Sequence, residues 1–552
     1  MRKLPTAVDD FKKIIDGGYY YVDKSMLIAK ILESASDVLM FQRPRRFGKT
    51  VNLTMLFYYF DIGRAEENRR LFRDLKIAQS EYFLEQGCYP VIYLSFKDIR
   101  SKDFAECKTN IYKAFLHLLD HFSFIYDKLS QGSRFIYDDL MRSKDSIFLV
   151  NAIFYLSKFL YEFYGKPVII LVDEYDAPVI DSWHKDYYRD IGDFWRTLFS
   201  SGLKGNPYMK FSVLTGLFRL TRDDLYAKML NSIIDTPYEG TVTRGENFFS
   251  FNEGEVVQIL KEYGLSHMME SVRKWYGGYQ YGNEEVYNPW SVIMFAKQRE
   301  FRTYWINPVN IDAITQLLGL MEDYDFRDLA TLLQNESIRK YIFRSLPFPL
   351  VISDKKIWTF LLDIGYLTLK RDSVEEGCGY LRIPNREVYT FFRCSFIEKF
   401  VGLSSPHFEE LLSSVRGGVI TGQNSFEENL QAIVHAKSRE LAPGNSDIFC
   451  YGFTFSLAMA LQREYAFYVN IVEKIGKIEL LLRPKDKNQE GYALALKSLR
   501  DGESHDEALA EAHEAMDKSG YKALFAESGI SRVTAVAVTL YGDAFRIRQK
   551  GF

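Results

Sequence analysis

The sequence predicts an α/β protein with a parallel β-sheet flanked by helices in its N-terminal half. Short apolar runs lie between stretches of helical pattern, and their branched and aromatic residues are typical of buried strands. These runs are 38–41, 90–96, 167–172 and 211–216. Acidic or hydroxyl-bearing residues stand at the ends of the third and fourth runs. Because parallel strands end at one edge of a sheet, we expect these polar side chains to meet in a crevice there.

The first apolar run leads into a basic loop, and a helical pattern follows that loop directly. Except at its first position, the loop has the G-x-x-x-x-G-K-[ST] phosphate-binding form: Arg43, Pro44, Arg45, Arg46, Phe47, Gly48, Lys49 and Thr50. Backbone N–H groups around Gly48, at a helix N-terminus, would donate to phosphate oxygens. Lys49 would reach the β- and γ-phosphates of ATP, and the Thr50 hydroxyl would bind Mg²⁺. Until a second motif supports the first, a basic turn with a chance Gly-Lys-Thr is the alternative.

The second motif is the Asp173-Glu174 pair, which ends the third apolar run. Asp173 would hold Mg²⁺ through its hydration shell, and Glu174 would polarise the water that attacks ATP. Together the two motifs predict a P-loop nucleoside triphosphatase. Thr215, near the end of the fourth run, could sense the γ-phosphate, and Arg219 or Arg222 could stabilise charge on it. Either arginine could act within its own subunit or across an interface, and a surface salt bridge is an equal alternative.

The composition is that of an ordinary globular protein, with 47% hydrophobic and 26% charged residues among 552. This length predicts about two to four domains. The formal charge of −3 excludes a strong whole-chain attraction to nucleic acid or anionic membranes, so nucleic acid would need a local basic patch. The five cysteines form no C-x-x-C pair, and no apolar run has the length of a signal peptide or a membrane span. We therefore expect a cytoplasmic protein without a membrane partner.

Beyond the fourth run the pattern becomes helical and irregular, with aromatic clusters beside glycine or proline at 275–279 and 287–291. Such clusters indicate packed corners, and a role as a lid over the nucleotide is the alternative. A helix at 358–362 precedes a short hairpin. Residues 403–552 alternate helices and strands, which predicts a C-terminal α/β domain with a mixed sheet. The strands expected there are 467–471, 478–482, 492–496 and, last in the chain, 533–540.

Several motifs occur together and in a fixed order. They are Tyr-Val-Asp-Lys-Ser at 21–25, the phosphate loop, Val-Asp-Glu-Tyr-Asp-Ala-Pro at 172–178, the two aromatic corners and Ile-Pro-Asn-Arg-Glu-Val at 383–388. In this the chain resembles, over nearly its whole length, the prokaryotic AAA-ATPase-like proteins, in which an arginine such as Arg43 is usual at the first loop position. The resemblance implies a P-loop ATPase domain of the additional-strand class at 1–245, a helical lid and winged-helix-like linker at 246–402, and a PD-(D/E)xK nuclease-like domain at 403–552.

The nuclease domains of that family place an Asp on one strand and Glu-x-Lys on the next, so that carboxylates bind Mg²⁺ and the lysine orients water. The matching positions here are Glu479, Ala495 and Lys497. Because Ala495 removes a metal ligand that nothing adjacent replaces, we expect a degenerate nuclease fold that has lost cleavage. The alternative is an active nuclease that borrows a carboxylate from Asp447 or Glu473.

Two classes of function follow from these motifs. The first is an ATPase whose nucleotide state controls the C-terminal domain, and the family's frequent link to mobile elements suggests nucleic-acid processing or defence. The second is a non-hydrolytic, ATP-gated scaffold in which that domain binds nucleic acid or protein without cutting. A homo-oligomer is compatible with either class.

Overall fold

The computed structural model describes most of the chain. The described residues are 1–145, 147–183, 185–218, 232–235, 247–306, 323–342, 356–371, 377–402, 405–416, 425–438, 446–472, 477–518, 520–541 and 544–551. The chain divides into two compact units, which we call the N-terminal unit (Met1–Trp305 and Lys340–Asn385) and the C-terminal unit (Ile306–Arg339 and Arg386–Phe552). The three domains expected from the sequence stay a prediction.

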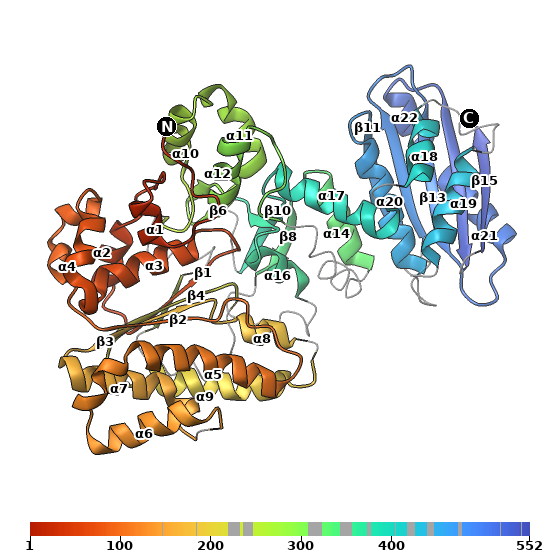
Figure 1. Ribbon diagram of the computed structural model, residues 1–552. Helices are drawn as coiled ribbons and strands as arrows, with labels where there is room; N and C mark the ends of the chain where they lie inside the picture. The colour runs from red at the N-terminus through yellow and green to blue at the C-terminus, as the bar shows by residue number, and fades with distance from the viewer. Residues whose placement is uncertain are drawn as a thin grey trace. The chain divides into compact units, whose positions relative to one another are not determined.

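A five-stranded parallel sheet forms the centre of the N-terminal unit (Figure 1). Its strands are β1 (Val38–Gln42), β2 (Val91–Ser95), β3 (Val168–Asp173), β4 (Met209–Gly216) and β5 (Ser232–Asp235). The spatial order is β2-β3-β4-β1-β5, and each neighbouring pair is parallel. β4 therefore lies between the strand that precedes the phosphate loop and the strand that ends in Asp173. The predicted parallel sheet is confirmed, whereas β5 has no counterpart among the four apolar runs.

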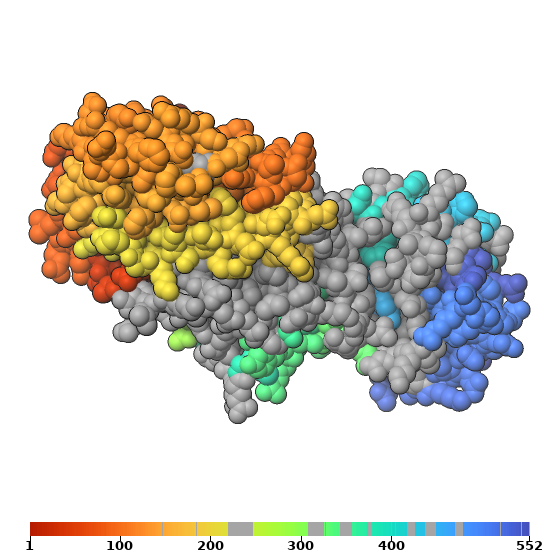
Figure 2. Space-filling view, turned by 90° about the horizontal axis from the view of Figure 1, so that it is seen from below, coloured from red at the N-terminus to blue at the C-terminus, as the bar shows by residue number. Residues whose placement is uncertain are grey.

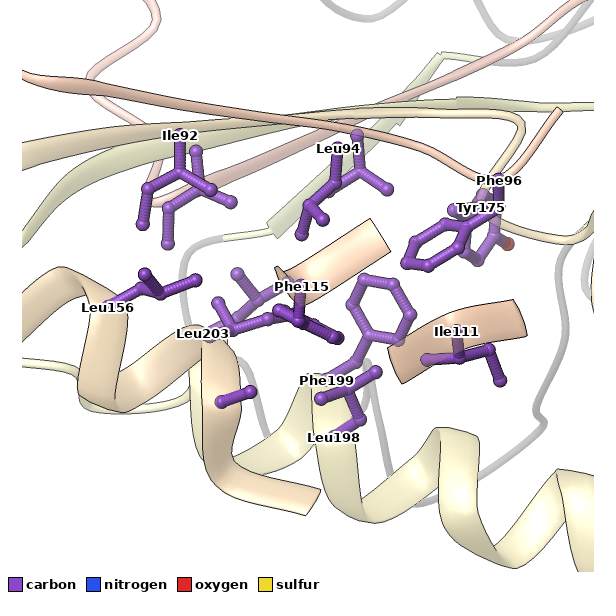
Figure 3. Close-up of a cluster of buried hydrophobic side chains, with 14 of the residues drawn as sticks. Ile92, Leu94, Phe96, Ile111, Phe115, Leu156, Tyr175, Leu198, Phe199 and Leu203 are labelled. Carbon is purple, nitrogen blue, oxygen red and sulfur yellow. The ribbon is translucent and has the colours of Figure 1, made fainter. Parts of the chain in front are cut away.

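Helices cover both faces of this sheet (Figure 1). One face packs against α1 (Phe11–Asp16), α2 (Met26–Glu33) and α3 (Lys49–Phe60), and the other against α5 (Phe104–His121), α6 (Gln131–Arg142), α7 (Ala152–Tyr164) and α9 (Tyr188–Leu203). Because side chains alternate along a strand, Ile92 and Leu94 of β2 point to the same face and share a buried cluster with Phe115 and Leu198 (Figure 3). Figure 2 shows the outer surface that helices α5, α6, α7 and α9 form on this side.

Shorter elements complete the N-terminal unit. They are α4 (Ala65–Arg69), α8 (Ala177–Ser182), α10 (Glu253–Glu262), α11 (Met269–Tyr276), β6 (Tyr279–Tyr281), β7 (Glu284–Val286), α12 (Pro289–Gln298), α16 (Ile357–Asp363), β9 (Thr368–Leu369) and β10 (Cys378–Arg382). Strands β6 and β7 form an antiparallel hairpin, and β9 pairs antiparallel with β10. The helix and the short hairpin expected from residue 358 onward are therefore confirmed.

The C-terminal unit is built on a second five-stranded sheet, in the order β11-β12-β13-β14-β15. Its elements are α14 (Asp323–Leu333), α17 (Arg386–Phe400), α18 (Pro406–Arg416), α19 (Ser425–Ser438), α20 (Ser446–Leu461), β11 (Tyr465–Val472), β12 (Lys477–Pro484), β13 (Gly491–Ser498), α21 (His505–Lys518), α22 (Tyr521–Glu527), β14 (Val533–Tyr541) and β15 (Ala544–Gly551); β8 (Ile338–Tyr341) spans the sequence boundary between the units. Only the β13–β14 pair is parallel, so the predicted mixed sheet is confirmed. The strand expected to be last is not, because β15 follows it and pairs with it. Among the helices of the described chain, none combines the length and apolar character that a membrane span requires.

Candidate functional site

The phosphate loop connects β1 to α3. All residues of β1 are buried, so the core holds the start of the loop in place. Gly48 ends the loop as the N-cap of α3, with a left-handed backbone (φ 78°) that favours glycine. A Cβ atom built at Gly48 would meet no atom within 4 Å, so the space beside this helix N-terminus is open. Free N–H groups at a helix N-terminus bordered by open space suit a phosphate group.

Lys49 begins α3 and turns its ammonium back into the loop. Its Nζ donates hydrogen bonds to the carbonyl oxygens of Arg43 and Pro44, both at 2.9 Å. Burial lowers the pKa of Lys49, while the Glu174 and Asp173 carboxylates oppose that shift. These two carboxylates and the two carbonyl oxygens stabilise the buried ammonium.

Asp173 is fully buried at the end of β3 and accepts two short hydrogen bonds from hydroxyl groups. Thr50 Oγ1, in the first turn of α3, donates to Asp173 Oδ2, and Thr215 Oγ1, near the end of β4, donates to Asp173 Oδ1, each at 2.7 Å. The strand order explains this meeting, because β4 lies between β1 and β3. Hydroxyl and carboxylate oxygens are the donors that Mg²⁺ prefers, so Thr50 and Asp173 fit the expected ion.

Glu174 follows Asp173 in a strained backbone conformation, with φ at 49°. Such strain in a residue other than glycine is found mainly where the surrounding structure imposes it, often at functional sites. Among the described residues, the Glu174 carboxylate makes no hydrogen bond or ion pair. Burial raises its pKa, and the Lys49 charge opposes that shift. The carboxylate is therefore available to a ligand or a water molecule.

Asp176 is the other acid close to this strand, and its carboxylate is already engaged. Its Oδ2 atom accepts hydrogen bonds from the backbone N–H groups of Leu217 (2.7 Å) and Phe218 (2.8 Å). Burial raises the pKa of Asp176 to about 6. A Cβ atom on Gly216 would come within 2.7 Å of Asp176 Oδ1, so glycine permits the close approach of the two segments. Of the two acids, Glu174 alone can face a water molecule with both oxygens.

Aromatic side chains far along the sequence hold the phosphate loop from the other side. The Arg43 guanidinium lies 5.0 Å from the ring centre of Tyr281 and 5.4 Å from that of Phe249. Arg46 stacks on Trp290 at 4.5 Å. The Phe47 ring packs edge-on against Tyr279 and also contacts Tyr281. These contacts are a finding of the structure, because the sequence indicated packed corners, or a lid over the nucleotide, without naming the loop residues that the aromatic side chains contact.

The Ile-Pro-Asn segment at 383–385 locks the corner that supports the β6–β7 hairpin. Asn385 Nδ2 donates to the Gly277 carbonyl at 2.7 Å, and Arg382 Nη2 donates to the Gly278 carbonyl at 2.9 Å. A Cβ atom on Gly278 would lie 2.0 Å from the Pro384 carbonyl oxygen, so only glycine fits there. Motifs separated by about a hundred residues thus build one support for the phosphate loop.

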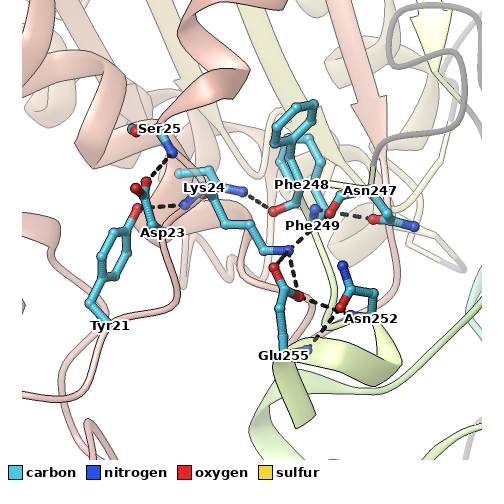
Figure 4. A network of polar contacts seen from close by, with 10 residues as sticks. Tyr21, Asp23, Lys24, Ser25, Asn247, Phe248, Phe249, Asn252 and Glu255 are labelled. Carbon is cyan, nitrogen blue, oxygen red and sulfur yellow. Dashed lines mark hydrogen bonds and ion pairs between the residues drawn. The ribbon is translucent and has the colours of Figure 1, made fainter. Parts of the chain in front are cut away.

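A buried ion pair links the N-terminal segment to α10 (Figure 4). Lys24 Nζ lies 2.7 Å from Glu255 Oε1 and donates to the Asn247 carbonyl at 3.0 Å. Burial lowers the pKa of Lys24, and Glu255 opposes that shift. The neighbouring Phe248 carbonyl accepts a 2.8 Å hydrogen bond from Asn52 Nδ2 of α3, so the same segment also contacts the phosphate-loop helix.

The remaining predicted residues of this site are placed in part. Arg45 lies in the loop with an exposed side chain. Arg219 and Arg222 lie outside the described residues, so their roles stay predictions. The structure brings Thr50 and Thr215 to Asp173, with Lys49 and Glu174 beside them, and the roles of these residues stay predictions.

The predicted nuclease position lies on the C-terminal sheet. Glu479 of β12 is directly opposite Ala495 of β13, and Lys497 is two residues further along the same face. The nearly buried Lys497 ammonium lies 3.6 Å from a carboxylate oxygen of Glu503 and 3.6 Å from one of Glu511. Sequence reasoning missed these two acids. Among the described residues, no three His, Cys, Asp or Glu side chains gather closely enough to hold a metal ion.

The N-terminal region of the chain is similar to known proteins. Residues 5–226 match the model of the AAA-ATPase-like family, described as "Predicted AAA-ATPase". A stretch of 306 residues is 27% identical to the "Uncharacterized protein in vnfD 5'region" of Azotobacter chroococcum mcd 1, covering 55% of this chain and 54% of that protein. The chain thus spans about half the length of this relative. The N-terminal region is thus similar to the AAA-ATPase-like family, and this match lies wholly within the N-terminal unit.

Proposed function

We propose that the N-terminal unit binds ATP with Mg²⁺ and hydrolyses it. The observation that carries this proposal is the hydrogen-bonded group of Thr50, Asp173 and Thr215, with Lys49 and the free Glu174 carboxylate beside it. These groups come from two neighbouring parallel strands, β3 and β4, and from the N-terminus of α3, where an open crevice is expected. The AAA-ATPase-like match over residues 5–226 supports the same conclusion.

Each residue has a defined task in this proposal. The backbone N–H groups of the 43–50 loop and the Lys49 ammonium hold the phosphates. To do so, Lys49 exchanges its hydrogen bonds to the loop carbonyl oxygens for contacts with phosphate. Thr50 and Asp173 hold Mg²⁺, which when bound neutralises phosphate charge. Glu174 orients the attacking water and accepts its proton. Thr215, near the end of β4, keeps the Asp173 carboxylate in place through its hydrogen bond.

Two substitutions separate binding from hydrolysis. Lys49→Ala should abolish ATP binding, measured by calorimetry, and Lys30→Ala on the surface of α2 is the matched control. Glu174→Gln should still bind ATP but lose turnover by about two orders of magnitude or more, because an amide cannot accept the proton. Unchanged ATP affinity in the Lys49 variant would refute the assignment of the site.

The C-terminal unit belongs to the same proposal as a nuclease-like domain that does not cut and whose state follows the bound nucleotide. Ala495 occupies a metal-ligand position, and Glu503 and Glu511 neutralise the Lys497 ammonium. A lysine held by two carboxylates is poorly placed to orient a water molecule. These contacts favour, as the second candidate, an ATP-gated module that binds nucleic acid or protein. Self-association and a cytoplasmic location stay predictions from the sequence.

The test is a cleavage assay with single- and double-stranded DNA and RNA, in Mn²⁺ and ATP. We expect no products from the full chain. Cleavage that disappears in Lys497→Ala would establish an active nuclease instead. In that case Asp447 and Glu473 remain candidate metal ligands, although Glu473 and the Asp447 side chain lie outside the described part of the structure. The structure adds the carboxylates of Glu503 and Glu511 as further candidates.

A further inference from the structure

Three arginines stand in the phosphate loop, and the structure gives them different surroundings. Arg43 is buried, and its guanidinium lies between the Phe249 and Tyr281 rings. Arg46 stacks on Trp290. Arg45, between them, is exposed and makes no hydrogen bond, ion pair or ring contact with any described residue. Two of the three guanidinium groups therefore serve the packing of the loop, and the third is left for a ligand.

Arg45 is also close to the groups expected to act on the γ-phosphate. Lys49 Nζ donates a 2.9 Å hydrogen bond to the carbonyl oxygen of Pro44. Because this carbonyl belongs to the peptide bond between Pro44 and Arg45, the backbone of Arg45 lies next to the lysine ammonium. The Arg45 charge interacts with the charges of both Glu174 and Lys49. The guanidinium thus lies within electrostatic range of both functional groups.

We propose that Arg45 is a catalytic residue that contacts the γ-phosphoryl group of ATP within its own subunit and stabilises the negative charge on it during hydrolysis. The inference rests on the proposed ATPase function. In the reaction, the water oxygen bonds to the γ-phosphorus while the bond from that phosphorus to the β–γ bridging oxygen breaks. Glu174 takes the water proton, and ADP leaves with the electron pair of the broken bond. Charge on the equatorial oxygens suits a planar guanidinium that donates two parallel hydrogen bonds.

The test separates transition-state stabilisation from binding. Arg45→Ala should lower kcat by about two to three orders of magnitude while the Kd for ATP changes only slightly, as for an interaction made in the transition state. Arg45→Lys should recover part of kcat, because an ammonium supplies charge without the bidentate geometry. Arg73→Ala removes another exposed arginine that has no partner among the described residues, and it should leave turnover unchanged. Arg45→Gln provides a second variant should the alanine variant fold poorly.

A transition-state mimic gives an independent readout. The wild-type chain should trap ADP with aluminium fluoride, and Arg45→Ala should lose that trapping while it still binds ATP. A kcat within about threefold of the wild type, or retained trapping, would overturn the role of Arg45 and leave the ATPase assignment intact. Turnover restored by mixing Arg45→Ala with Lys49→Ala chains would show action on a neighbouring subunit and refute the assignment within one chain. A wild-type chain that binds no ATP would instead refute the proposed function itself.

Discussion

Replacing Asp176 with asparagine tests how the structure buries the carboxylate that lies between β3 and α8. The variant keeps the size of the side chain and an oxygen that can accept from the Leu217 and Phe218 N–H groups, but it cannot ionise. Burial raises the pKa of Asp176 to about 6, from an ordinary value of 3.8. The ionised form is therefore less stable in the folded protein than in the unfolded chain.

The sign and size of the effect follow from this shift. Because the pKa of Asp176 is higher in the folded protein than in the unfolded chain, its protonated form stabilises the fold. This stabilisation is complete below pH about 4 and is lost as the pH rises through about 6. A tenfold change in proton affinity corresponds to about 1.4 kcal/mol, so the total contribution is about 3 kcal/mol. About 2 kcal/mol of it should disappear between pH 4.5 and 7.5. The stability of Asp176→Asn relative to the wild type should therefore rise by about 2 kcal/mol over this range.

Tryptophan fluorescence during urea unfolding can measure this change in one unit. All six tryptophans, which are Trp183, Trp195, Trp275, Trp290, Trp305 and Trp358, lie in the N-terminal unit. Asp9→Asn is the control, because the Lys97 side chain holds the pKa of the Asp9 carboxyl below its ordinary value despite some burial. Its titration lies below the tested range, so its stability difference should stay flat. A flat or falling difference for Asp176→Asn would refute the argument.

Two further substitutions test the contacts that hold the phosphate loop and its surroundings. Lys24→Met should lower the free energy of unfolding of the N-terminal unit by about 3 kcal/mol, because Glu255 loses the ammonium that it pairs with. Adding Glu255→Gln should recover part of this loss. If fluorescence-detected unfolding shows no recovery, the ion pair does not stabilise the unit. Arg43→Gly, which restores the usual glycine of the motif, should lower the same quantity by about 2–3 kcal/mol through lost ring contacts and added chain entropy. Arg45→Gly should show only the entropy term of about 1 kcal/mol, and an equal loss in both variants would contradict the role of the Arg43 contacts.

The parallel sheet was predictable because its central strands are long, apolar and bounded by polar residues. The sequence pattern alone was insufficient to predict elements that are very short or whose ends are set by a single side-chain contact. β5 (Ser232–Asp235) has only four residues, and nothing local distinguishes it from a loop. The Gln-Gly-Ser sequence at 131–133 favours a break in the helical pattern, yet α6 begins there because the Ser130 side chain caps it by accepting from the Ser133 N–H group.

Local signals also failed where a distant segment supplied a better partner. Ser25 precedes α2 and is a residue type that caps helices, but its side chain makes no capping bond. Its Oγ atom accepts a 3.1 Å hydrogen bond from the Ile77 N–H group instead. Asp23 accepts from the distant Lys76 N–H group with one oxygen and from the neighbouring Ser25 N–H group with the other. The Tyr-Val-Asp-Lys-Ser motif is thus explained mainly by tertiary contacts, among them the Lys24–Glu255 ion pair. The residues of this pair are too far apart in the chain for a local sequence pattern to reveal it.

In the candidate site, residues with a fixed chemical role were predictable and residues that support them were not. Lys49, Thr50, Asp173 and Glu174 could be named in advance because the two motifs contain them at fixed positions. The lysine partners Glu503 and Glu511 in the C-terminal unit were not predictable. They lie beyond β13 in the chain, and only the packing of α21 and the preceding loop brings them to Lys497.

The arginine at the first position of the phosphate loop has a physical explanation. Arg43 is not among the residues with positive φ, so its backbone has no need of glycine, whereas Gly48 at φ 78° does. The side chain of Arg43 is then free to pack against Phe249 and Tyr281. Residues 247–249 also meet Lys24 and Asn52, so the loop, its helix and α10 share one set of contacts. The same segment therefore holds both the phosphate loop and the helical part of the unit.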